Sequence, residues 1–157
     1  MWETKSMREE KDMENKTEAQ CLYELAMKHI YGDGVPEDNE LAVKLLTRAK
    51  DMGHVEAAYN LGICYHYGYG TAIDLGKAYE LYLYSANSGY GKGMELVGRF
   101  YNRGIHVEQN RTQAEYWLRK AMESTDPEAA LEAQKELLYA ESGSGNYLPV
   151  DNQAGTW

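Results

Sequence analysis

The feature that most constrains this chain is a 36-residue repeat that runs through its middle without a gap. Gly32 and Gly68 lie 36 positions apart, and so do Gly68 and Gly104. Other small and aromatic positions keep this spacing; examples are Tyr23 and Tyr59, Ala42 and Ala78, Gly62 and Gly98, Tyr65 and Tyr101, and Ala78 and Ala114. A register shared by so many positions predicts a protein built from stacked copies of one unit.

Each copy predicts two helices joined by a glycine-rich turn. In the second copy, the first helix is expected over 56–67, and Gly68 supplies the left-handed conformation that ends it. Asp74 is the expected N-cap of the second helix, over 75–87. Gly62 and Ala78 are small enough to let the two helices approach closely. The chain is therefore predicted to be all-α.

The second copy also carries a recognisable pattern of positions, namely Ala57, Leu61, Gly62, Tyr65, Gly68, Gly70, Asp74, Ala78, Tyr82, Ala86 and Gly89. This pattern resembles the Sel-like repeat (SLR) family of the tetratricopeptide-repeat superfamily. The resemblance implies a right-handed α-solenoid with copies at 19–54, 55–90 and 91–126 and a partial copy at 127–141. The departures are Ala26 and His29 in the first copy, and His106 and Asn110 in the third, where His106 replaces the second loop glycine and predicts a looser turn.

The two ends of the chain do not follow the repeat. Residues 1–18 are rich in Glu and Lys and are expected to form a charged extension or capping helix. The last helix is expected over 127–140, with Asp126 as N-cap, Pro127 in the first turn and a solvated acidic outer face. Residues 142–157, with several Gly and Ser, are expected to form a flexible tail.

Charge and hydropathy exclude several classes of partner. The net charge is −9, and most of it comes from residues 1–18 and 123–157. An acidic chain repels nucleic acid and anionic membranes, so neither is an expected partner. No apolar run approaches the roughly 20 residues of a membrane span, and 1–20 lack the apolar core of a signal peptide. A cytoplasmic protein is the resulting expectation.

Residues that could carry chemistry are sparse. No pair of histidines has metal-ligand spacing, and Cys64 and His66 would point to opposite sides of a helix. The glycines at 89, 91 and 93 have the wrong spacing for a dinucleotide loop. We therefore expect no cofactor, no metal and no enzymatic activity, with a hydrolase as a remote alternative.

The resemblance to the tetratricopeptide fold implies that the first helix of each pair lines the ligand-binding face. The matching positions imply a protein-binding surface made of Tyr23, Met27, Tyr31, Tyr59, Ile63, His66, Tyr67, Glu95, Arg99, Asn102 and Arg103. Different interpretations of Arg99 and Arg103 stay open: a clamp for a partner's carboxylate, solvated surface charges, or ion pairing with Glu95 on the same helix. The tyrosines could equally pack inward or contact the ligand.

Two functions of different classes follow. The first is an adaptor or scaffold that holds a peptide or protein partner on the face of the first helices. The second is an immunity or inhibitor protein that neutralises a toxin. Small size and acidity would suit this role, and the resemblance also implies it, because similar SLR proteins occur in such roles.

Overall fold

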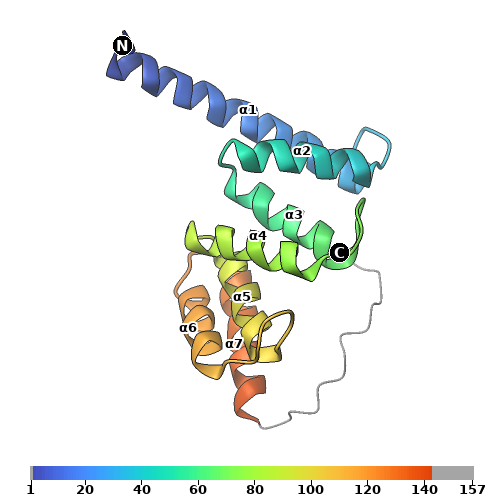
Figure 1. The fold of residues 1–157 in the computed structure, drawn as a ribbon, viewed down its shortest axis with the longest axis vertical. Helices are drawn as coiled ribbons and strands as arrows, with labels where there is room; N and C mark the ends of the chain where they lie inside the picture. The colour runs from blue at the N-terminus through green and yellow to red at the C-terminus, as the bar shows by residue number, and fades with distance from the viewer. Residues whose placement is uncertain (1, 143–157) are drawn as a thin grey trace.

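The computed structural model describes residues 2–142, and this part of the chain folds into helices joined by short turns (Figure 1). In chain order they are α1 (Lys5–Tyr31), α2 (Asn39–Asp51), α3 (Val55–Tyr67), α4 (Leu75–Asn87), α5 (Gly91–Arg103), α6 (Arg111–Met122) and α7 (Pro127–Glu141). They stack as three successive pairs, α1 with α2, α3 with α4 and α5 with α6, and α7 follows the last pair (Figure 1). The all-α solenoid predicted from the repeat is confirmed.

The helix boundaries follow the 36-residue register of the sequence. The second helices of the pairs, α2, α4 and α6, begin at Asn39, Leu75 and Arg111, each 36 residues after the one before. The first helices α1, α3 and α5 end at Tyr31, Tyr67 and Arg103, again 36 apart. We call α1, α3, α5 and α7 the A helices, and α2, α4 and α6 the B helices.

The turns between the helices of each pair are made by the expected caps. Gly32, Gly68 and Gly104 end α1, α3 and α5 in the left-handed conformation. The side chain of Asp74 accepts a hydrogen bond from the Lys77 amide at 3.0 Å and so caps α4. Asp38 and Asn110 cap α2 and α6 in the same way.

The third copy keeps this turn although His106 stands where the second copy has Gly70. His106 has φ of 62°, the positive value found at the loop glycines, and it is the one non-glycine residue between 2 and 142 to do so. Room for its ring comes from Gly76, where an added Cβ would lie 3.1 Å from His106 Cε1. The turn thus keeps its left-handed residue as a histidine, whose ring lies beside the glycine at the start of α4.

The two helices of a pair meet at a glycine. A Cβ on Gly62 would lie 2.6 Å from Cε1 of Tyr82, which is fully buried, and Ala78 beside it is buried as well. In the next pair a Cβ on Gly98 would lie 2.6 Å from Cγ of Leu118. The close contact predicted around Gly62 and Ala78 is therefore present.

The first helix is longer than the repeat requires. The charged extension and the first A helix form one continuous helix from Lys5 to Tyr31, capped by Thr4. Residues 5–14 and 16–18 are exposed, and burial against α2 begins at Ala19. The extension therefore projects beyond α2 (Figure 1). The tail expected at 142–157 lies, except for Ser142, outside the described residues.

Candidate functional site

Side chains of three A helices surround a hollow of about 190 Å³ on the face that these helices form. We call it the A-face hollow. Its volume is below the roughly 300–1,000 Å³ of small-molecule pockets and suits side chains of a protein partner. It is lined by Tyr59, Ile63 and Tyr67 of α3, Lys92, Glu95, Leu96 and Arg99 of α5, and Glu128, Ala129 and Glu132 of α7. Five of the eleven residues predicted to bind a partner are among them.

The aromatic wall of the hollow is held in place by neighbouring rings. Tyr59 packs edge-on against Tyr90, with ring centroids 5.3 Å apart, and burial raises the pKa of its hydroxyl well above the usual value. Tyr67 is exposed at its edge and stacks on His66 at 4.4 Å with an interplanar angle of 8°. Both tyrosines thus offer rigid rings, which lose little conformational entropy on binding.

His66 supports this wall from behind. Its Nδ1 lies 3.2 Å from the Tyr82 hydroxyl, and its ring meets Phe100 edge-on. Burial, and then the positive charge of Arg99, lower the pKa of His66 to about 4. The imidazole is therefore neutral at pH 7, and its stacking with Tyr67 involves no charge.

The arginine clamp expected from the sequence already holds a carboxylate of the same chain. Arg103 donates from Nε to Glu136 Oε1 at 2.9 Å and from Nη2 to Oε2 at 2.7 Å. Asn102 donates to the same Oε1 at 2.7 Å. Burial acts to raise the pKa of Glu136, but these hydrogen bonds outweigh it and lower the pKa. Arg103 and Asn102 therefore join α7 to α5.

The second arginine lies among three carboxylates. Arg99 Nη2 is 2.7 Å from Glu95 Oε1 and 3.9 Å from Glu132 Oε2, and its Nε is 3.9 Å from Glu136 Oε2. The pair between Arg99 and Glu95 predicted as one alternative is therefore formed as an ion pair. Glu95 is buried, which raises its pKa to about 7; Arg99 opposes this shift, and the carboxylates of α7 add to it.

The remaining predicted residues lie at the N-terminal end of the same face. Tyr23 stacks on His54 with centroids 4.5 Å apart, and its hydroxyl accepts a hydrogen bond from Asn60 at 3.4 Å. Met27 and Tyr31 reach towards Ile63 of α3 and line a narrow gap of about 10 Å³ with it. Ile63 therefore connects the residues of α1 to the A-face hollow.

Sequence reasoning missed the role of α7 in this site. Its acidic face was expected to be solvated, but Glu136 is 4% exposed and turned towards α5. Glu132 lines the hollow, and Glu128 pairs with Lys92 at 2.5 Å. The signal was the spacing of these three acids by four residues, which places them on one side of a helix. The basic residues opposite, at 92, 99 and 103, lie on one side of α5.

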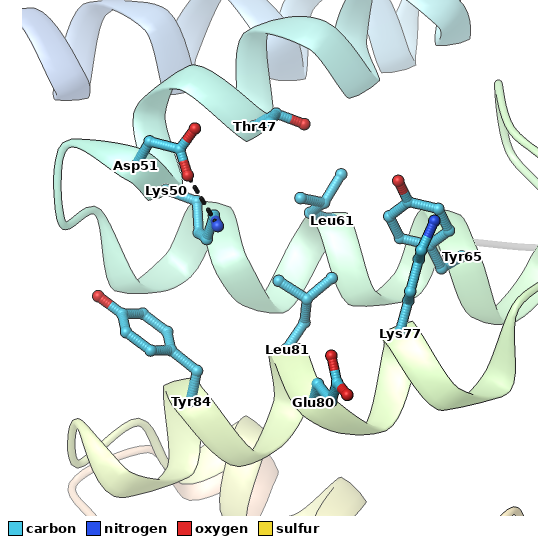
Figure 2. Close-up of a pocket in the computed structure, with 9 residues that line it drawn as sticks. All are labelled: Thr47, Lys50, Asp51, Leu61, Tyr65, Lys77, Glu80, Leu81 and Tyr84. Carbon is cyan, nitrogen blue, oxygen red and sulfur yellow. Dashed lines mark ion pairs between the residues drawn. The ribbon is translucent and has the colours of Figure 1, made fainter.

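A second hollow, of about 530 Å³, lies on the other side of the stack, between the B helices α2 and α4 (Figure 2). We call it the B-face groove. Leu61 and Tyr65 of α3 form its floor, and Leu81 projects into it from α4. Its rim is made of Thr47, Lys50, Asp51, Lys77, Glu80 and Tyr84. No residue of this groove was predicted to bind a partner.

Reactive groups are few in the described chain. Cys64 is buried, which raises the pKa of its thiol to about 11 and makes it a poor nucleophile at neutral pH. Within residues 2–142, no three His, Cys, Asp or Glu side chains are grouped so that they could hold a metal ion. A helix long and apolar enough to cross a membrane is also not found in this part.

Stacked pairs of helices, with the A helices forming one face and the B helices the other, define an α-solenoid of the tetratricopeptide type. The chain belongs to the Sel1 repeat family, and the sequence model of this repeat matches residues 19–54, 55–90 and 91–131. Sel1 repeat proteins generally mediate protein–protein interaction.

Two solved structures share this fold. One is a Sel1 repeat protein from Oxalobacter formigenes, with a TM-score of 0.67 and 26% identity over 71% of this chain and 46% of that one. The other is c5321, described as a protective antigen of uropathogenic Escherichia coli strains with an SLR fold. It also has a TM-score of 0.67 and 26% identity, over 79% of this chain and 30% of that one.

Two proteins of known name are similar in sequence. The chain is 32% identical over 104 residues to chitin synthase regulatory factor 2 of Schizosaccharomyces pombe, which is 64% of this chain and 20% of that protein. It is 30% identical over 103 residues to eukaryotic elongation factor 2 kinase of Rattus norvegicus, 57% of this chain and 14% of the kinase. The chain thus spans a fifth or less of the length of these relatives.

Proposed function

We propose that this protein is an adaptor or scaffold that binds a peptide or protein partner on the face of its A helices. The observation that carries this proposal is the A-face hollow, in which rigid tyrosines of α3 stand opposite charged side chains of α5 and α7. Aromatic residues and arginine are the types enriched at the centres of protein interfaces. In both named relatives the similar region is a small part of a larger protein, as is usual for an interaction module joined to other activities.

The ion pairs around the hollow give the site its polar specificity. Arg103 and Glu136 satisfy each other, and Lys92 is paired with Glu128. The proposed partner therefore does not need to supply a carboxylate for Arg103. Its apolar groups would contact Tyr59, Ile63 and Tyr67, while its polar groups would meet the rim formed by α5 and α7.

Site-specific photocrosslinking tests this proposal. A photoreactive phenylalanine analogue replaces Tyr67 in one variant and Tyr116 in another, because both tyrosines are exposed but Tyr116 lies on the B helix α6. Both variants are expressed in the source cells, irradiated and analysed by mass spectrometry. We expect position 67 to give a crosslinked protein that position 116 does not. A crosslink formed from position 116 and absent from position 67 contradicts the proposal.

A further inference from the structure

The B-face groove differs from the corresponding place in the next repeat. Thr47, Leu61 and Leu81 surround it, on α2, α3 and α4. Adding 36 to each number gives Leu83, Val97 and Trp117. Trp117 is only 8% exposed and packs in the core, with Leu83 half-buried against the same cluster. The third copy thus places an indole where the second has Leu81, and Leu83 where the first has Thr47, although Val97 is smaller than Leu61; the net gain in side-chain volume comes from Trp117 and Leu83.

The charged side chains at the rim of the groove differ in whether they form ion pairs. Lys50 forms an ion pair with Asp51 at 2.7 Å, and Lys77 forms one with Asp74 at 3.9 Å; the Lys77 ammonium also lies 5.1 Å from the centroid of the Tyr65 ring (Figure 2). Glu80, by contrast, is exposed and makes no ion pair among the described residues. The Glu80 carboxylate is therefore available to pair with a cation of a partner.

The next repeat shows what surrounds a buried aromatic residue in this position. Lys120, one turn after Trp117, lies 5.5 Å from the centroid of its ring and donates a hydrogen bond to the Tyr116 hydroxyl at 3.2 Å. Tyr116 is the residue that corresponds to Glu80. An aromatic side chain with a basic side chain beside it is thus a combination that this surface already accommodates.

We propose that the B-face groove binds a partner segment that inserts one large aromatic side chain between Leu61 and Leu81 and places a basic side chain at Glu80. The aromatic ring would occupy the place that Trp117 takes in the following repeat. Its burial against the two leucines would supply most of the affinity, and the cation would orient the segment. This surface lies on the B helices and is independent of the A-face hollow.

A blocked tryptophan tests whether the groove binds an aromatic side chain. The probe is N-acetyl-tryptophanamide, titrated into the full chain and followed by NMR, with N-acetyl-alaninamide as the apolar control. We expect amide shifts at Leu61, Tyr65 and Leu81 with the tryptophan probe alone. Leu81→Trp fills the groove with a side chain of the protein itself and should weaken binding of the probe at least about tenfold. Thr47→Leu, a smaller change that narrows the same groove, provides a second variant should the first not fold.

The basic part is tested by two dipeptides, N-acetyl-Trp-Lys-amide and N-acetyl-Trp-Glu-amide. The lysine peptide should bind more tightly, and Glu80→Gln should remove the difference. Tyr67→Ala should bind both as the parent does, which separates this result from the A-face proposal. The inference is overturned if the folded groove variants bind the tryptophan probe like the parent, if the shifts lie elsewhere, or if the two dipeptides bind equally.

Discussion

Arg103 and Glu136 are joined by two parallel hydrogen bonds, of 2.9 and 2.7 Å, that connect the last helix of the stack to the A helix before it. Because α7 has no B helix after it within the described chain, this pair and its neighbours hold it in place. The contact adds to the apolar packing of α7, which buries Ala129 and Ala133.

Replacing Glu136 with Ala should therefore destabilise the protein strongly. The change leaves Arg103 and Asn102 without the acceptor that they share, and because Arg103 is partly exposed, the loss of these charged hydrogen bonds should cost about 2–3 kcal/mol. Chemical denaturation would measure the loss, and hydrogen exchange should show α7 opening first. Glu128→Ala is the matched control, since the side chain of Glu128 is 71% exposed and its pair with Lys92 should contribute less than about 1 kcal/mol. Equal losses in the two variants would show that Glu136 has no special role.

Gly62→Ala should destabilise the contact between α3 and α4. The added methyl would lie 2.6 Å from the buried ring of Tyr82, and such overpacking costs about 1–3 kcal/mol despite the better helix propensity of alanine. Thermal melts of the variant would measure the effect. Gly76→Ala places its methyl 3.1 Å from Cε1 of His106, but this ring is exposed and can shift, so the variant should lose clearly less stability than Gly62→Ala. Should Gly62→Ala melt like the parent, the close approach of the two helices would be wrong.

The stability of the protein should respond to the titration of Glu95. Burial raises the pKa of this group to about 7 from 4.5, so the folded state binds a proton more readily than the unfolded state. The free energy of unfolding should therefore rise as the pH falls from about 7 towards 4.5. The charged and titratable groups that face Glu95 are Arg99 and Lys92 on α5, Tyr59 on α3, and the three glutamates of α7. The Glu95→Gln variant should lack this rise in stability between pH 7 and 4.5.

His66 gives the opposite dependence in an overlapping range. Its pKa is lowered from 6.5 to about 4, so the unfolded state takes up the proton first. The contribution of neutral His66 is complete above pH 6.5 and is lost as the pH falls towards 4. Denaturant midpoints of the parent, Glu95→Gln and His66→Asn between pH 8 and 5 would separate the two groups. If neither variant changes the slope of stability with pH, both assignments fail.

The positive φ of His106 leads to a prediction in which two effects on stability oppose each other. A histidine at φ of 62° is less favourable than glycine, which adopts this conformation freely. His106→Gly should relieve that strain, while the contact of the ring with Tyr79, whose centroid is 6.0 Å away, is lost. We expect stability to change by less than about 1 kcal/mol, with the gain and the loss partly cancelling. A loss of several kcal/mol would show that the His106 ring is a structural part of the turn.

The repeat register allowed most of the fold to be predicted, because caps and small residues such as Gly68 and Asp74 act locally and recur at fixed spacing. The expected helix over 75–87 and the N-terminal boundary at Pro127 agree with the structure. The joining of residues 5–18 to the first repeat was less visible, since no glycine or proline marks where an extension ends and the repeat begins.

The site was harder to predict than the fold. The side chains of Arg99 and Arg103 were placed on the A-helix face by their repeat positions, but the sequence did not show which acids face them. That depends on how α7 packs on α5, and therefore on contacts between residues about 33 positions apart, such as Arg103 and Glu136. The B-face groove depends on differences between repeats, such as Leu81 and Trp117, rather than on the pattern that they share.

Calorimetric titration of the crosslinked partner tests the central claim most directly. Purified partner is titrated into the parent, Tyr67→Ala and Tyr116→Ala, with thermal melts in parallel to confirm that each variant is folded. We expect Tyr67→Ala to weaken binding by about 2 kcal/mol, roughly 30-fold, and Tyr116→Ala to bind like the parent. Parental affinity in Tyr67→Ala, together with weakened binding in Tyr116→Ala, would contradict binding on the A-helix face.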